Sequence, residues 1–208
     1  IRNAEVGIRI GTPDLDTLPD LTLQEVKIEN ISGTGLLAFS ADVFATNLLI
    51  NNCRQHNLGV FIGGHYRFKH CTFASYNFDF FREDPGVLIS DNFITADNQL
   101  LSDDTDIELL NCIIDGSLRN ELLFAATGGV AFLADVRNNL IKTEQEELAD
   151  LGNLLNEDPL FIDASMYDYR LDTLSPVINQ GLDLGVINDL DNQPRDAQPD
   201  LGANERIE

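Results

Sequence analysis

Basic residues are scarce in this chain. Its 208 residues include 13 lysines and arginines against 35 aspartates and glutamates, a formal net charge of −22. Nucleic-acid binding needs a basic surface that neutralises phosphates, so this balance argues against DNA or RNA as a partner. The chain also lacks an apolar run of about 18 residues, so we expect no membrane-spanning helix. This composition suits a secreted, periplasmic or outer-surface protein.

Cysteine is scarce too, with 3 residues. Cys71 and Cys112 occupy equivalent positions in the repeats described below, and Asn92 occupies that position in the repeat between them. Strands two repeats apart lie about 9–10 Å from each other, too far for a disulfide. Cys53 occupies a different position within its repeat. We therefore expect free thiols that fill the interior, and the cysteines do not settle the redox compartment.

A short phrase recurs from the first residues to Ile141. It consists of an apolar residue, a polar one and a second apolar one, followed by a turn that Asn or Asp opens. Repeats of about 20 to 50 residues are typical of solenoids, in which one unit stacks on the next. The phrases end at residues 28, 50, 73, 94, 114 and 141, in steps of 22, 23, 21, 20 and 27; they read Val26-Lys27-Ile28, Leu48-Leu49-Ile50, Cys71-Thr72-Phe73, Asn92-Phe93-Ile94, Cys112-Ile113-Ile114 and Asn139-Leu140-Ile141.

Each repeat carries a second strand-like phrase after its turn. Alternation over three to five residues between polar turns indicates strands, and a repeat this short has no room for the helix of a flatter parallel sheet. The leucine spacing of a leucine-rich repeat is absent. We therefore predict an all-β fold, a parallel β-helix. The second phrases are Gly7-Ile8-Arg9-Ile10, Leu36-Leu37-Ala38-Phe39, Gly59-Val60-Phe61-Ile62, Phe78-Asp79-Phe80 and Glu121-Leu122-Leu123-Phe124.

Asparagines mark the corners of the predicted coils. Asn3, Asn30, Asn52 and Asn138 fall at or beside equivalent corners, where this side chain tolerates left-handed backbone. His70 falls at such a corner and replaces the asparagine of other coils.

The pattern divides the chain at residue 142. Residues 1–142 form the predicted coils, and because Ile1-Arg2-Asn3 already matches the end of a coil, we expect an N-terminally truncated β-helix. Residues 143–208 are predicted to form a helix and a loop-rich capping tail of the same domain. Thr143 to Glu146 resembles a capping box that opens a helix to about Leu151, ended by Gly152.

The middle residues of the first phrases should point outward, and most of them are apolar. A continuous apolar stripe is unfavourable in water. We expect the helix and tail to cover it, although a subunit contact, and hence an oligomer, is the alternative. The stripe consists of Lys27, Leu49, Thr72, Phe93, Ile113 and Leu140.

The tail resembles the closing segment of a known family. The similarity is carried by Asp158-Pro159-Leu160-Phe161-Ile162-Asp163, Asp168-Tyr169-Arg170-Leu171, Ser175-Pro176-Val177-Ile178-Asn179-Gln180-Gly181, Asp189-Leu190-Asp191-Asn192-Gln193-Pro194-Arg195 and Asp200-Leu201-Gly202-Ala203-Asn204-Glu205. Together with the coils, these segments resemble secreted bacterial right-handed parallel β-helix proteins of the pectate-lyase-like superfamily, common in Bacteroidetes. The resemblance implies the architecture and no single activity, since the superfamily includes lyases, hydrolases and proteins without assigned chemistry. Within the tail, we expect Arg195 to pair with Asp191 or Asp200.

One region departs from the acidic background. His56, His65 and His70 lie within fifteen residues, and on a solenoid the next coil would add further side chains to the same patch. A lyase acting on uronic acids needs a cation for the carboxylate and a base for the proton, roles that His65, Tyr66, Arg67 or Lys69 could take. Glycan contact without catalysis and an ordinary solvated surface remain the alternatives. The candidate glycan contacts are His65, Tyr66, Arg67, Lys69, Tyr76, Asp79, Arg82 and Glu83.

Acidic clusters suggest two further sites, both weaker. Asp103-Asp104-Thr105-Asp106 offers carboxylates for a glycoside hydrolase, but consecutive acids in a turn are better explained as solvated. A structural calcium ion at one of two other acidic loops is the second hypothesis, although neither loop has the residue spacing of a calcium-binding hand. These loops contain Asp14, Asp16 and Asp20, and Asp183, Asp189 and Asp191.

The sequence thus favours a non-catalytic surface protein that interacts with carbohydrate or has a structural role. A polysaccharide lyase or glycoside hydrolase acting on acidic glycans is the alternative, and an adhesin or assembly module that recognises protein is a third class. No catalytic or metal-binding residue is assigned, and no cofactor is predicted beyond the calcium ion left open. The candidate partners are a polysaccharide or glycan, or further copies of the chain.

Overall fold

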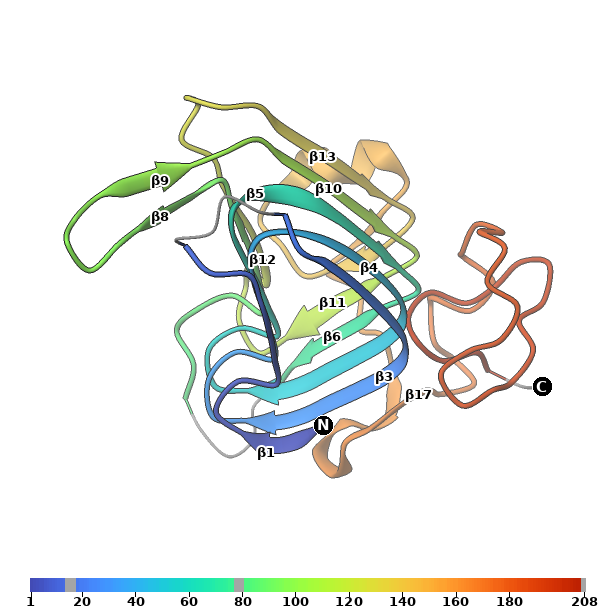
Figure 1. Cartoon of the computed structure of the whole chain (residues 1–208). Coiled ribbons are helices and arrows are strands. Elements are labelled where there is room, and N and C mark those ends of the chain that lie inside the picture. Colours follow the sequence, from blue (N-terminus) through green and yellow to red (C-terminus); the bar gives the residue numbers. More distant parts are fainter. Residues whose placement is uncertain (14–17, 77–80, 207–208) are drawn as a thin grey trace.

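The structure is a computed structural model that describes residues 1–13, 18–76 and 81–206. Strands are the main secondary structure of this part of the chain, and its helices are the short 3-10 segments η1 (Glu146–Leu151) and η2 (Ala164–Met166). Within the described ranges, no helix is long and apolar enough to cross a membrane. One 13-stranded parallel sheet dominates the molecule and curls on itself (Figure 1).

The chain visits three parallel ladders of this sheet in turn. The first ladder contains β2 (Ile8–Ile10), the start of β4 (Leu36–Cys53), the start of β5 (Leu58–Lys69), β7 (Val87–Ser90) and β12 (Leu122–Ala125). The second contains the start of β3 (Asp20–Ile31), the middle of β4, the end of β5, β10 (Thr105–Leu110) and β13 (Phe132–Arg137). The third contains β1 (Arg2–Ala4), the ends of β3 and β4, β6 (Thr72–Ser75), β11 (Ile113–Gly116), β14 (Leu140–Ile141) and β15 (Leu154–Leu155).

The third ladder confirms most of the predicted register. Ile28 pairs with Ile50, Ile50 with Phe73, Phe73 with Ile114, and Ile114 with Ile141. All five side chains are fully buried inside the curl, where they form one column of the core. Equivalent residues one repeat apart therefore lie directly over one another, as the periodic phrase predicts.

Ile94 is the exception, and its predicted place in the stack is wrong. β8 (Asn92–Ile94) pairs antiparallel with β9 (Leu100–Ser102), and Ile94 lies opposite Leu100. This hairpin projects from the curled sheet (Figure 1). Its Phe93 ring packs edge-on against Phe39 and Phe61 of the first ladder, at centroid distances of 5.1 and 5.7 Å. The apolar alternation that predicts a coil strand therefore occurs here in a hairpin outside the stack.

This insertion also corrects the positions of the cysteines. Because β6 pairs directly with β11, Cys71 and Cys112 lie on adjacent strands rather than two repeats apart, and the Ile113 amide donates to the Cys71 carbonyl at 2.9 Å. Both thiols are fully buried, and they and Cys53 are unbridged. In the next two repeats, Asn139 and Asn153 occupy the position equivalent to Cys112. The Asn139 side chain accepts the Cys112 amide, and the Asn153 side chain accepts the Asn139 amide.

The corners are occupied by residues with left-handed backbone, but they form two sets. Asn3, Asn30 and Asn52 have φ angles of 60°, 56° and 51° at one corner. Asn138 belongs to another corner, in a set with Asn47, His70 and Asn111 at φ between 51° and 55°. The prediction that His70 replaces a corner asparagine is confirmed, and the Asn111 amide lies 3.0 Å from its Nε2.

The tail covers the outward face of the third ladder, as the apolar stripe predicts. It includes β16 (Phe161–Asp163) and β17 (Asp168–Leu171), an antiparallel pair. Ile113 and Leu140 pack against Leu171, Val177 and Leu201, while Leu49 packs against Tyr169 and Ala203. The Ala203 amide donates to the Thr72 hydroxyl at 2.9 Å, which fixes the tail to the ladder.

Two local predictions need correction. The Thr143 hydroxyl donates to Asn120 Oδ1 and accepts from the Gln145 amide, so the helix that follows is a 3-10 turn without a side-chain cap, although Gly152 does end it. Arg195 pairs with Glu205 at 2.9 Å rather than with Asp191 or Asp200, because its buried guanidinium points toward the segment after the predicted acids.

Candidate functional site

Strand alternation divides the predicted glycan contacts. On β5, His65, Arg67 and Lys69 lie on the outer face of the second ladder, while Tyr66 and Phe68 between them point into the core. Tyr66 is fully buried: its hydroxyl donates to the Gly63 carbonyl at 2.8 Å and accepts from the Ala41 amide. Burial raises the pKa of this phenol. Tyr66 therefore supports the core, and three residues of the patch share a surface.

The other predicted contacts lie elsewhere. Tyr76 bonds to Asp115 and packs against Phe161 of the tail. Arg82 is buried, and its Nη2 donates to both carboxylate oxygens of Glu121. Glu83 is exposed on a shallow pocket that also includes Arg82, and Asp79 lies outside the described residues. The structure thus brings together His65, Arg67 and Lys69 and separates them from the rest.

Each of these three side chains already faces a carboxylate. The register places Asp42 and Asp106 on either side of His65, and Glu108 beside Arg67. His65 Nδ1 lies 2.6 Å from Asp42, Arg67 Nη2 lies 2.7 Å from Asp106, and Lys69 Nζ lies 3.8 Å from Glu108. Partly exposed pairs of this kind add little stability. They do neutralise the patch, so it offers no unpaired cation for an anionic ligand.

Phe44 is the residue that the sequence patch missed. It stands on the same outer face, directly opposite Arg67 in the neighbouring strand, and it is 36% exposed. Lys69 Nζ lies 5.9 Å from the centre of its ring. Shifting the sequence by one repeat, 23 residues from Phe44 to Arg67, would have placed this aromatic side chain in the patch.

A cavity opens beside this ring, and we call it the Phe44 pocket. It measures about 370 Å³ and lies between the outer face and the tail segment 184–188. The tail wall is fixed, because Asn47 Nδ2 donates to the Asn188 carbonyl at 2.7 Å and Arg195 donates to Asn47 Oδ1 at 3.0 Å. The pocket is lined by Gln24, Glu25, Phe44, Thr46, Asn47, Lys69, Leu184, Gly185, Val186, Ile187 and Asn188.

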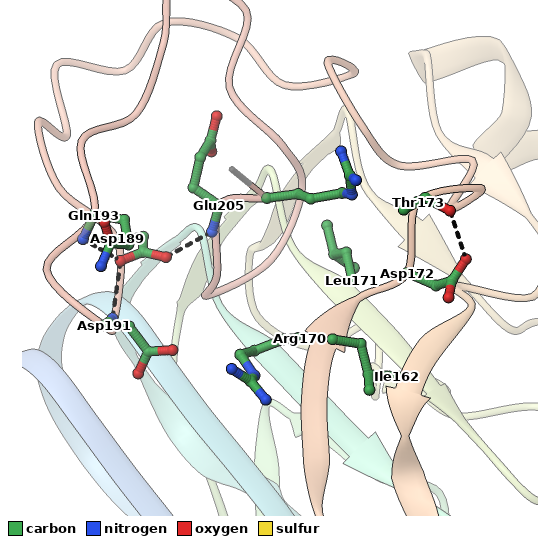
Figure 2. A pocket seen from close by; sticks show the side chains of 10 residues that line it. Ile162, Arg170, Leu171, Asp172, Thr173, Asp189, Asp191, Gln193 and Glu205 are labelled. Atoms are coloured by element: carbon green, nitrogen blue, oxygen red, sulfur yellow. Dashed lines mark hydrogen bonds between the residues drawn. The ribbon is translucent and has the colours of Figure 1, made fainter. Parts of the chain in front are cut away.

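Two further cavities border the tail. The corner pocket measures about 560 Å³ and is lined by Glu25, Lys27, Leu49, Tyr167, Asp168, Tyr169, Arg170, Leu190, Asp191 and Asn204. The tail pocket measures about 370 Å³, and Figure 2 shows Arg170 and Ile162 from the hairpin on one side of it and Asp189 and Asp191 from the following loop on the other. Arg170 forms a two-pronged bond with Asp168, which lowers the pKa of that carboxyl.

The loops considered for calcium show no cluster of metal ligands among the described residues. Asp189 instead accepts backbone amides from Asp191, Gln193 and Glu205 at 2.7–2.9 Å, bonds drawn in Figure 2. The Asp189 carboxylate therefore stabilises the loop by accepting these three backbone amides. Asp14 and Asp16 of the other loop lie outside the described residues, and Asp20 is exposed at the start of β3.

The turn considered for a hydrolase also uses its acids locally. Asp103 Oδ1 accepts the Asp104 amide at 2.8 Å, and Asp104 Oδ1 accepts the Ala131 amide at 2.9 Å. Asp106 lies on β10 beyond the turn and pairs with Arg67. The side chains therefore stabilise the turn and its neighbours, in agreement with the solvated-turn interpretation.

A scan against protein-family models finds no match to this chain, and a search of curated proteins finds no relative.

Proposed function

We propose that the curled sheet is a right-handed parallel β-helix of the pectate-lyase-like kind, from a secreted or cell-surface bacterial protein. The cyclic path through three parallel ladders supports the winding, and the tail on the third ladder resembles the closing segment of that family. We assign a right-handed winding because connections between parallel strands of one sheet are right-handed in nearly all proteins.

The protein binds an uncharged polysaccharide at the Phe44 pocket and does not cleave it. The observation that carries this proposal is the partly exposed ring of Phe44 at the edge of a cavity whose lining includes amide, hydroxyl, ammonium and carboxylate groups. A sugar ring has an apolar face of C–H groups and an equator of hydroxyls. An aromatic floor with a few convergent polar groups matches both features.

The neutral character of the ligand follows from the neighbouring charges. His65, Arg67 and Lys69 are each matched by a carboxylate. A uronate carboxylate would compete with these acids in a protein of net charge −22. An uncharged hydroxyl meets no such repulsion and can bond to donors and acceptors alike.

Affinity electrophoresis tests the proposal, with gels that contain β-glucan, mannan or xylan, or the acidic polygalacturonate or alginate. We expect a neutral polysaccharide to retard the protein, and Phe44→Ala to weaken retardation at least about tenfold, or about 1.4 kcal/mol. Phe81→Ala is the matched control, because Phe81 is 82% exposed and does not line this pocket. Equal retardation of the two variants, or retardation by acidic polymers alone, would contradict the proposal.

A second candidate, a lyase acting on acidic glycans, is favoured by one observation. Asp42 orients His65 through Nδ1 at 2.6 Å, which is how a carboxylate prepares the other imidazole nitrogen to accept a proton. Arg67 lies two residues away on the same face. Unsaturated uronate product, formed by the protein and lost in His65→Ala, would establish this activity in place of simple binding.

A further inference from the structure

The three cavities along the tail share lining residues. Glu25 lines both the Phe44 pocket and the corner pocket, while Arg170 and Asp191 line both the corner pocket and the tail pocket. Cavities that share lining residues lie next to one another, and we propose that these three form one groove that holds a linear, uncharged oligosaccharide over several sugar units. This inference rests on the proposed function, which requires the Phe44 pocket alone.

The Phe44 and corner pockets share a continuous floor and two walls. The floor is β4 from Phe44 through Thr46 and Asn47 to Leu49, five steps of about 3.3 Å, or at most about 16 Å along the strand. The chain bends at Asn47, where φ is 51°, so the groove turns a corner. One wall is β3 with Gln24, Glu25 and Lys27, and the other is tail segment 184–191.

The tail wall is held in place before any ligand arrives. The Arg195 guanidinium, whose side chain is 2% exposed, bonds to Asn47, to the Gly202 and Ala203 carbonyls and to Glu205. These bonds tie the tail to the strand that forms the floor. A preformed groove avoids the ordering cost that a mobile loop would add to binding.

The charges in the first two cavities balance. Three acids, Glu25, Asp168 and Asp191, stand against three bases, Lys27, Lys69 and Arg170. The tail pocket adds three acids, Asp172, Asp189 and Glu205, and one base, Arg206, so the balance belongs to the first two cavities. There, a lining of mixed donors and acceptors without net charge suits a chain of hydroxyls better than a polyanion or a polycation.

An extended peptide is the rival ligand, and the floor disfavours it. Peptides in extended form gain affinity mainly by adding a strand to a free sheet edge. β4 is paired with β3 on one side and with β5 and β6 on the other, so its backbone groups are already used. The floor therefore offers a ligand its side chains and no free strand edge.

Calorimetric titration with cello-, manno- and xylo-oligosaccharides of two to six units tests the groove. We expect affinity to rise at least about tenfold from the shortest to the longest oligomer of the recognised sugar. Arg170→Ala should remove most of this gain, because Arg170 lines the two cavities beyond the Phe44 pocket. Phe44→Ala should weaken binding at every length.

Arg137→Ala is the matched control. Arg137 bonds to Asp135 as Arg170 bonds to Asp168, two positions apart in each case, and the two arginine side chains are 48% and 60% exposed. Arg137 lies outside the groove. An unchanged length dependence in Arg170→Ala, with Phe44 still required, would overturn the groove and keep the proposed function. Absence of binding to every oligomer would overturn both, and competition by an extended neutral peptide would show that the groove is a peptide site.

Discussion

At the scale of single residues, His70 gives the fold a defined pH response. Its side chain is fully buried among Asn111, Arg195, Asp200 and Lys69, and burial lowers its pKa to about 3 from a usual value near 6.5. Between these values the unfolded chain binds a proton that the folded protein excludes, so this residue makes stability fall as the pH decreases. The effect is absent above about pH 6.5 and grows toward pH 3.

The variant His70→Asn should lack this contribution, since asparagine does not titrate and occupies the same corner at Asn47 and Asn111. Between about pH 7.5 and pH 5, we expect the variant to lose about 2 kcal/mol less free energy of unfolding than the wild type. Urea unfolding followed by circular dichroism at both pH values measures the difference. Parallel pH profiles would show that His70 is protonated in the folded protein.

The sequence was sufficient to predict that His70 occupies a coil corner. It was sufficient for only part of the patch of predicted glycan contacts. His65, Arg67 and Lys69 could be assigned to one face because alternation along a single strand is local. The same alternation, followed strictly, would have placed Tyr66 in the core. Phe44 and the carboxylates that neutralise the patch lie on other strands, so their positions depended on a register that the sequence leaves approximate.

At the scale of elements, the contact between the tail and the third ladder depends on Gly202. Its φ is +86°, and a Cβ there would lie 2.7 Å from both Ile113 Cδ1 and Thr72 Oγ1. Gly202→Ala should therefore push the tail off the ladder. Gly128→Ala is the control, since Gly128 has a φ of +75° with nothing within 4 Å of an added Cβ.

We expect Gly202→Ala to cost about 1–3 kcal/mol more than its control, because both share the backbone strain and the overpacking occurs in one. Hydrogen exchange of amides in residues 161–206 should accelerate in Gly202→Ala alone. Equal exchange in the two variants would mean that the tail does not depend on this close approach.

Elements were predictable where they repeat and not where the pattern is interrupted. The column from Ile28 to Ile141 could be identified because each member recurs after a similar interval. The hairpin of β8 and β9 was misassigned because Phe93 is apolar for a different reason: it packs on Phe39 and Phe61 from outside. The predicted capping box failed because Asn120, distant in sequence, bonds to the Thr143 hydroxyl.

At the scale of the whole molecule, the tail does more than cover an apolar face. It lines the whole tail pocket and one side of the Phe44 and corner pockets. These two pockets arise only when the tail lies against strands that precede it by more than a hundred residues. Loops carry little periodic signal. Sequence reasoning therefore identified the polar side chains of β5 but not the cavities that the tail lines. The same segment thus caps the third ladder and lines the candidate site.

A crystal structure of the protein with a six-unit oligomer of its preferred neutral polysaccharide would test this account most directly. We predict electron density for sugar rings over Phe44 that continues past Glu25 toward Arg170. Density on another face of the molecule, with the Phe44 pocket filled only by water, would contradict it.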